Sequence, residues 1–174
     1  MWNLLRRSLK MGCLTEEIQQ EQTETEPLAG EAHYVRKKFL SGRSFHIRHL
    51  DCGSCNGCDW EMTALLNPVY DIQRLGLDFV ASPRHADVLM CTGPVSTQLL
   101  QAALATYEAA PHPKIVVAVG DCAINGGVFQ EAYATQQGVG KVLPVDIMIP
   151  GCPPSPSDML NALLKALGSS PYKK

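Results

Sequence analysis

The chain has 174 residues, 45% of them hydrophobic, which is enough for one globular core with an extension. Its formal net charge of −2 excludes the basic excess typical of nucleic-acid-binding proteins. No apolar segment approaches the roughly 20 residues of a membrane span, so we expect no transmembrane helix or signal peptide, and seven cysteines that stay reduced in the cytoplasm.

The N-terminal part of the chain differs in composition from the rest. Residues 1–10 place hydrophobic side chains at helical spacing beside three basic residues, and six glutamates follow between Glu16 and Glu31. This pattern fits either a weakly ordered tail or an arm that docks on a partner or a membrane surface. We therefore divide the chain into an N-terminal extension, residues 1–43, and an α/β domain, residues 44–174.

Beyond the extension, short hydrophobic segments alternate with helical ones. The patterns predict five strands, at residues 45–50, 77–81, 86–92, 114–119 and 145–149. They predict three helices, at residues 59–66, 97–109 and 155–167, the last capped by Gly168. Strands that alternate with helices favour a parallel sheet. We predict a flavodoxin-like open, mostly parallel sheet with helices on both faces.

The cysteines fall at distinct places in this layout. Cys58, Cys122 and Cys152 each lie just past the carboxyl end of a predicted strand, where open α/β sheets gather their ligands. Cys91 lies inside a strand and is expected to pack in the core, and Cys13 lies in the extension as a surface thiol. Three loops that are distant in sequence are therefore expected to converge at one edge of the sheet.

Five of the cysteines are candidates for a shared cofactor site. Cys52, Cys55 and Cys58 form one run, and Cys122 and Cys152 stand alone, the latter followed by proline as in ferredoxin cluster ligation. An iron–sulfur cluster needs four soft, anionic ligands that approach from different directions. Three cysteines in the run compete for two of these positions, and their spacing alone leaves the choice open.

Other interpretations of the cysteines belong to different classes of protein. The close pair Cys55 and Cys58 also suits a zinc knuckle or a thiol redox centre, so a structural zinc or redox-sensing domain is an alternative. A zinc site usually takes its other ligands from a second close pair, whereas Cys122 and Cys152 are 30 residues apart. We expect no nucleotide, because the glycines at 126 and 127 lack a phosphate-binding motif.

Several motifs between about residues 44 and 167 carry a family resemblance. In chain order they are CGSCNGCDWEM, YDIQRLG, SPRHADVLMCTGPV, GDCAINGGVF and IPGCPPSP. The chain resembles the small, electron-transfer subunit of group 4 membrane-bound, energy-converting [NiFe] hydrogenases, and is similar to the homologous subunit of NADH-quinone oxidoreductase (complex I). Complex I relatives carry adjacent cysteines where this chain has Gly57 and Cys58, which favours the hydrogenase branch.

The resemblance implies a specific set of ligands. It assigns one proximal-type [4Fe–4S] cluster to Cys55, Cys58, Cys122 and Cys152. Cys52 is then an additional thiol near the cluster.

The resemblance also implies a function and a set of partners. The chain would relay electrons, with no catalytic centre of its own, between a [NiFe]-hydrogenase-type large subunit and a ferredoxin-like subunit. With membrane-arm subunits, it would belong to a membrane-bound complex and lie peripherally on the cytoplasmic side of the cell membrane. The alternative within the family is a complex I-type relay that passes electrons to quinone beside a nickel-free large subunit.

Three charged residues are candidates for tuning the cluster. Arg84 and His85 are expected to face it, where a cation would raise its reduction potential and His85 would add proton coupling. The alternative is an ion pair between Arg84 and Asp87 that holds the loop. Glu61 is a candidate helix cap or proton acceptor, or is favoured only by the helix dipole.

Overall fold

The sheet of this protein, seen in a computed structural model that describes residues 44–168, has five parallel strands. Their spatial order is β2-β1-β3-β4-β5, the order of flavodoxin-like sheets, so the predicted fold class is confirmed. The predicted extension, residues 1–43, lies outside the described residues. The strands are β1 (Phe45–Asp51), β2 (Leu77–Phe79), β3 (Val88–Thr92), β4 (Ile115–Val119) and β5 (Ile147–Ile149).

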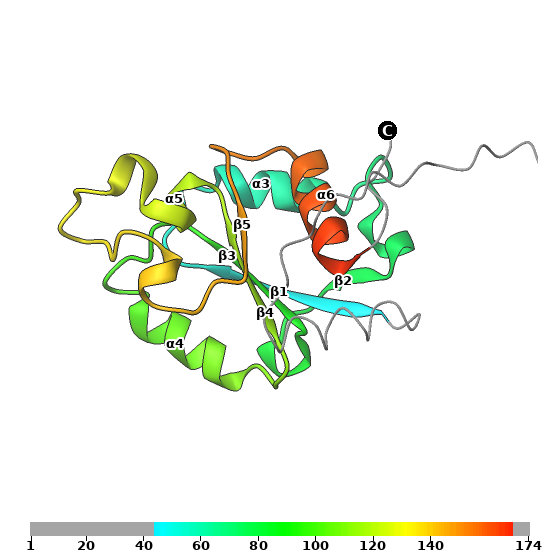
Figure 1. Cartoon of the computed structure of the whole chain (residues 1–174), viewed down its shortest axis with the longest axis horizontal. Coiled ribbons are helices and arrows are strands. Elements are labelled where there is room, and N and C mark those ends of the chain that lie inside the picture. The colour runs from blue at the N-terminus through cyan, green and yellow to red at the C-terminus, as the bar shows by residue number, and fades with distance from the viewer. Residues whose placement is uncertain (1–43, 169–174) are drawn as a thin grey trace, which may run out of the picture.

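Helices cover both faces of the sheet. In Figure 1, α3 (Gly57–Ala64) and α6 (Pro156–Leu167) lie on one side of the strands, and α4 (Leu100–Ala109) lies on the other. A short helix, α5 (Asp121–Asn125), follows β4 and was not predicted from the sequence. Over residues 44–168, no helix has the length and hydrophobicity needed to span a bilayer. Single 3₁₀ turns occupy Ile72–Leu75, Pro83–His85, Gly127–Phe129 and Val139–Lys141.

The hydrophobic core forms two clusters, one on each face of the sheet. Every residue of β3 and β4 is buried, as expected for the central strands of a parallel sheet with both faces covered. Met90 and Val117 face the cluster that contains residues of α3 and α6, whereas Cys91 and Ala118 face the cluster that contains α4. Burial of each aliphatic side chain contributes about 1.5–3 kcal/mol to the stability of the fold. We therefore expect the two central strands to contribute strongly to that stability.

Strand β3 begins at Val88, two residues later than its sequence pattern predicted, and two further elements also begin late. Helix α4 starts three residues late because the Thr97 N–H donates to the Ala134 carbonyl at 2.8 Å and holds that segment in a loop. Strand β5 starts two residues late: the Asp146 N–H donates to the Val116 carbonyl at 2.9 Å, but the Val116 N–H donates to the Asp146 carboxylate, at 2.8 Å, and not to a backbone carbonyl. In both cases a side-chain or loop contact competes with the regular element.

Helix α6 has defined signals at both ends, and the predicted Gly168 cap is confirmed. Ser155 Oγ accepts the Asp158 N–H at 3.2 Å, and the Asp158 carboxylate accepts the Ser155 backbone N–H at 3.3 Å, which forms a capping box. Gly168, with φ +79°, ends the helix in a left-handed conformation. The cap lies three residues after Cys152, so it also fixes the chain that follows that cysteine.

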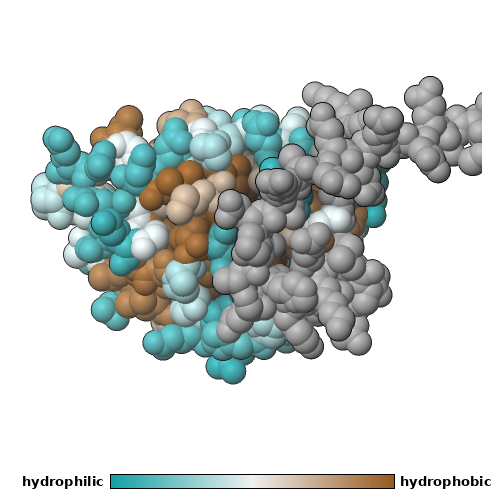
Figure 2. Space-filling view, viewed as in Figure 1, coloured by the Kyte–Doolittle hydropathy of each residue, from teal (hydrophilic) through white to brown (hydrophobic). Residues whose placement is uncertain are grey.

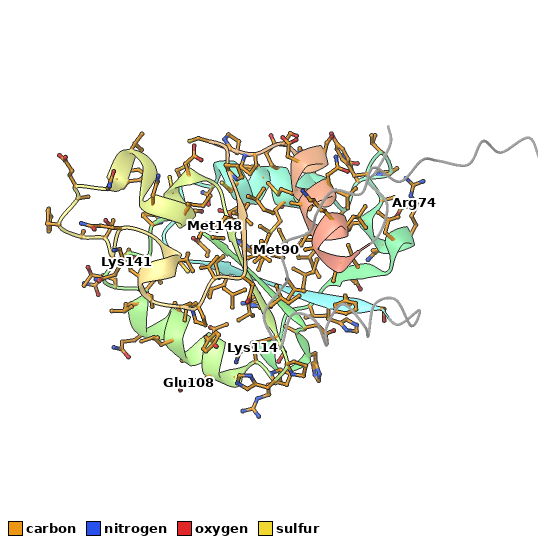
Figure 3. All side chains as sticks on the ribbon, in the orientation of Figure 1. Arg74, Met90, Glu108, Lys114, Lys141 and Met148 are labelled. Atoms are coloured by element: carbon orange, nitrogen blue, oxygen red, sulfur yellow. The ribbon has the colours of Figure 1, made fainter. Side chains whose placement is uncertain are left out.

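Lys114 is a buried cation at the C-terminal end of α4, with only 3% of its surface exposed. Its ammonium donates to the carbonyl oxygens of Tyr107, at 2.5 Å, and Ala110, at 3.0 Å, and lies 3.9 Å from the centroid of the Tyr107 ring. Figure 3 shows the side chain beside this end of the helix. The last carbonyls of a helix lack partners within it, so Lys114 satisfies two of them and complements the helix dipole.

Substitution Lys114→Met should lower the free energy of unfolding by about 1–3 kcal/mol, because it leaves buried carbonyls without their charged donor. Chemical denaturation followed by circular dichroism measures the change. Lys141→Met is the matched control, since Lys141 is exposed, and it should stay within about 0.5 kcal/mol of the parent. Equal stabilities of the two variants would contradict this role of Lys114.

Candidate metal centre

Four cysteines reach the carboxyl edge of the sheet from three loops. Cys55 and Cys58 follow β1, Cys122 lies in the first turn of α5 after β4, and Cys152 follows β5. Cys55 and Cys152 are exposed, while Cys58 and Cys122 are partly buried. Because these strands run parallel in one sheet, their loops meet at the same edge, as the sequence predicted.

The four thiols act on one another electrostatically. Burial raises the pKa of Cys58 to about 11, with further contributions from the Asp59 carboxylate and from the thiols of Cys55, Cys122 and Cys152. Burial is also the largest cause that raises the pKa of Cys122. The Cys152 and Cys55 thiols and the Asp121 carboxylate raise it further. The four thiols therefore lie near enough to one another to interact electrostatically. Their thiolates repel one another, so a bound cation would favour the deprotonated forms.

Glycines leave the space that these sulfur atoms occupy. A Cβ atom at Gly120 would lie 2.6 Å from Cys58 Sγ, and one at Gly127 would lie 3.1 Å from Cys122 Sγ. Both glycines have positive φ angles, +86° and +49°, which side chains disfavour. The edge is thus a cradle for four soft ligands, and this donor set fits an iron–sulfur cofactor.

Two of the cysteine loops are bonded directly to each other. The Asp121 N–H donates to the Gly151 carbonyl at 2.9 Å, and the Gly151 N–H donates to Asp121 Oδ1 at 2.9 Å. Each of these residues immediately precedes a cysteine, Cys122 or Cys152. This reciprocal pair therefore fixes the separation of the two backbones that carry these thiols.

The loop that carries Cys55 is held from both sides. Asp51 Oδ1 accepts the N–H groups of Gly53, at 2.9 Å, and Ser54, at 2.8 Å. Behind the loop, a Cβ atom at Gly93 would lie 2.6 Å from the Ser54 nitrogen. Asn56, with φ +67°, then turns the chain into α3 two residues earlier than predicted, so Cys58 lies within the helix.

Cys52 lies apart from these four residues. It is fully buried in the cluster on the α4 face, where its thiol donates to the Leu50 carbonyl at 3.7 Å. A hydrogen bond with Cys52, together with burial, raises the pKa of the neighbouring Cys91 thiol. The predicted core position of Cys91 is confirmed.

The expectation that Arg84 and His85 face the cysteines is wrong. They lie in the 3₁₀ turn that precedes β3, so the whole length of this strand separates them from the carboxyl edge. Asp87 in the same segment accepts the His46 N–H at 3.2 Å. Glu61 lies on α3, half-buried, one turn after Cys58.

A polar network behind α3 was missed in the sequence. Asp59 Oδ1 lies 2.8 Å from His49 Nε2 and accepts the Thr92 hydroxyl at 2.9 Å. His49 Nε2 and Thr92 Oγ1 are 3.0 Å apart. Two signals pointed to it: an acidic residue directly follows Cys58, and His49 occupies the core-facing side of β1.

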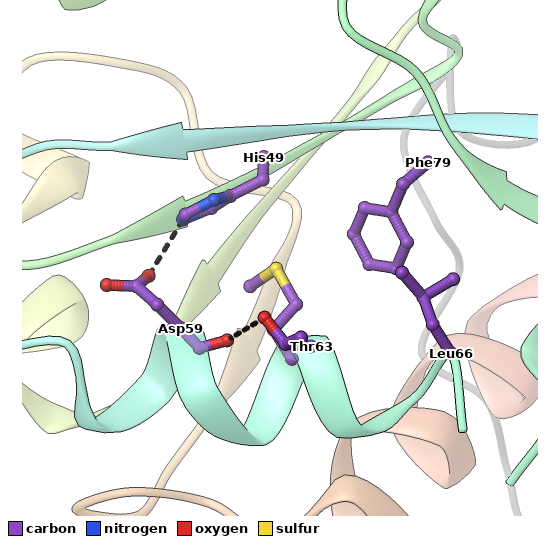
Figure 4. Close-up of a pocket in the computed structure, with 6 residues that line it drawn as sticks. His49, Asp59, Thr63, Leu66 and Phe79 are labelled. Carbon is purple, nitrogen blue, oxygen red and sulfur yellow. Dashed lines mark hydrogen bonds and ion pairs between the residues drawn. The ribbon is translucent and has the colours of Figure 1, made fainter.

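The network lines one end of a pocket of about 100 Å³ between α3 and strands β1 and β2 (Figure 4). The remaining lining is mostly apolar. Its residues are His49, Asp59, Met62, Thr63, Leu66 and Phe79. The Thr63 hydroxyl donates to the Asp59 carbonyl at 2.8 Å, so it bonds within the helix.

Comparisons with known proteins agree with this architecture. The chain is 48% identical over 130 residues to a probable membrane-bound hydrogenase subunit of Pyrococcus furiosus, covering 75% of this chain and 77% of that one. It is 46% identical over 108 residues to an NADH-quinone oxidoreductase subunit of Citrifermentans bemidjiense, covering 62% and 63%. A chain of the membrane-bound sulfane sulfur reductase, an archaeal respiratory membrane complex, superposes with a TM-score of 0.62 at 34% identity, covering 80% and 73%.

A family model described as NADH ubiquinone oxidoreductase, 20 Kd subunit, matches residues 55–166, a span that includes all four converging cysteines. This match and the relatives confirm the resemblance stated from the sequence motifs. With well over half of its residues matched, the chain belongs to the family of the NADH ubiquinone oxidoreductase 20 Kd subunit, a family of subunits of oxidoreductase complexes.

Proposed function

We propose that this chain binds one [4Fe–4S] cluster through Cys55, Cys58, Cys122 and Cys152 and relays electrons within a membrane-bound complex. The observation that carries the proposal is the convergence of four thiols from three loops at the carboxyl edge of the sheet, beside glycines that leave space for two of the sulfur atoms. When bound, the cluster would supply one-electron redox chemistry. The chain holds the four ligands in place and determines which molecules can reach them.

The spacing of the thiols supports a cluster over a single zinc ion. A tetrahedral zinc ion requires every sulfur within about 2.3 Å of one point. Among residues 44–168, no three cysteine, histidine or acidic side chains gather closely enough to bind one ion together. A cubane cluster binds each cysteine through a different iron atom, so its four ligands need not approach one common point.

Large hydrophobic side chains near the cysteines support a covering partner. Trp60, two residues after Cys58, is 73% exposed, and Val128 in the loop after Cys122 is 83% exposed. Met148 is also exposed on the edge strand β5, in the hydrophobic middle of the face that Figures 2 and 3 present. Exposed apolar groups beside a functional site are typical of an interface that is covered in an assembly.

The partners we propose are a [NiFe]-hydrogenase-type large subunit and a ferredoxin-like subunit. The hydrogenase relative, at 48% identity over 77% of its length, supports this choice. Membrane-arm subunits would complete the complex, with this chain on the cytoplasmic side. The six free cysteines among residues 44–168 suit that reducing compartment.

Alanine substitution of each ligand tests the cluster assignment. We expect Cys55→Ala, Cys58→Ala, Cys122→Ala and Cys152→Ala each to abolish the EPR signal of the reduced cluster, because a missing thiolate leaves one iron atom without its protein ligand. Cys52→Ala should retain the signal, since Cys52 is fully buried in the hydrophobic core. A full signal in any of the four would show that the ligand set is different.

Metal analysis of the intact complex tests the assignment to a hydrogenase. Anaerobic purification through a tag on this chain should yield nickel, iron and acid-labile sulfide, together with H₂-dependent dye reduction. A complex with iron and sulfide but without nickel or H₂ activity would instead support a complex I-type relay to quinone. Zinc without acid-labile sulfide would overturn the cluster altogether and support a structural zinc domain.

A further inference from the structure

The carboxylate of Asp59 lies next to the segment that carries Cys55 and Cys58, the first two proposed ligands. It directly follows Cys58, and its bonding partners come from three other segments. Thr92 at the end of β3 donates at 2.9 Å, His49 on β1 lies 2.8 Å away, and the Ser54 hydroxyl donates from the preceding loop. Figure 4 shows the side chains of His49 and Asp59 directed toward each other.

These partners distinguish Asp59 from an ordinary acidic residue in a first helical turn. Such a residue bonds to N–H groups of its own helix and interacts with the helix dipole. The side chain of Asp59 instead bonds to groups on the sheet and on the loop before the helix. It therefore joins α3 to the carboxyl ends of β1 and β3.

Ser54 connects this junction to the backbone near the ligands. Its hydroxyl donates to the Asp59 carboxylate and accepts the Asn56 N–H at 3.2 Å. Asn56 lies between Cys55 and the start of α3, so the middle of the segment that carries both cysteines is linked to Asp59 through the Ser54 hydroxyl. The end of the segment, Cys58, directly precedes Asp59 in the chain. The turn at Asp51 and the close contact with Gly93 hold the same loop independently of Asp59.

We propose that Asp59 is a positioning residue for the cluster: it holds the Cys55–Cys58 segment on the sheet, and its negative charge lowers the reduction potential of the cluster. This inference rests on the proposed cluster at Cys55, Cys58, Cys122 and Cys152. Reduction adds one negative charge to the cluster, and a carboxylate beside a ligand disfavours that charge. Hydrogen-bond donors to the carboxylate moderate this effect, because they stabilise and disperse its charge.

Two substitutions should shift the potential in opposite directions. Asp59→Asn preserves the shape and removes the charge, so the potential should become less negative. Thr92→Val removes one donor and leaves the charge less compensated, so the potential should become more negative. A purely structural role of the junction would not produce shifts of opposite sign.

The measurement is a potentiometric titration of the cluster EPR signal in the purified full complex. For Asp59→Asn we expect about a tenfold increase in the ratio of reduced to oxidised cluster at a fixed potential. This tenfold change corresponds to 59 mV for a one-electron couple. Asp59→Glu, which keeps the charge, and Thr92→Ser, which keeps the hydroxyl, should restore values close to the parent.

Asp78→Asn is the matched control, because Asp78 lies on β2 and bonds to Gln73 and to the Phe79 N–H, away from the cysteines. Its potential should equal that of the parent. Parent-like potentials for both Asp59→Asn and Thr92→Val would overturn the inference, as would shifts of the same sign. If Asp59→Asn fails to assemble, parent-like behaviour of Thr92→Val alone overturns it. Absence of the cluster signal from the parent complex would instead overturn the proposed function.

Discussion

The parallel direction of β1, β3, β4 and β5 is the constraint on which the site depends, because it brings the four carboxyl ends to a single edge. A parallel sheet is stable only when both of its faces are covered. The two hydrophobic clusters provide this cover and bury β3 and β4 completely. The arrangement of the cysteines is therefore set by the core, whose hydrophobic residues also hold the strand ends in register.

Beyond the strand ends, the loops are fixed to one another as well as to the sheet. The paired bonds between Asp121 and Gly151 join the second and third cysteine loops. Cys58 lies against Gly120, so the first loop contacts the second with no room for an intervening side chain. Since each loop limits the others, the edge behaves as one unit, and a change in one loop is expected to alter the position of all four thiols.

The fold and the convergence of the cysteines could be predicted because both follow from short-range patterns. Valine-rich segments marked the buried strands, and the rule for parallel sheets placed Cys58, Cys122 and Cys152 at one edge. The spacing of the cysteines could not predict the position of Cys52, because that position depends on the face of the sheet toward which the side chain points after β1. The Cys52 N–H donates to the Thr92 carbonyl and continues the alternation of β1, which turns the thiol into the core.

Long-range contacts account for the rest of what the sequence could not predict. Asp59 and Thr92 are 33 residues apart, and their bond exists only because α3 packs over β1 and β3. The error for Arg84 and His85 has a simpler origin: they precede their strand, and only residues that follow a parallel strand reach the carboxyl edge. To predict which residues reach the carboxyl edge, it therefore matters whether a residue precedes or follows its strand, and not only how close to the strand it lies in sequence.

The burial of Cys52 and Cys91 bears on how the protein would acquire the proposed cluster. In an unfolded chain all of the cysteines are accessible to an iron donor. Iron could then bind to cysteines that are not ligands in the folded protein. Once the sheet has formed, two of the six thiols among residues 44–168 are enclosed in the core and only the four at its edge remain accessible. For the proposed cluster, a sheet that has already formed would therefore leave only these four thiols of residues 44–168 open to iron and sulfide.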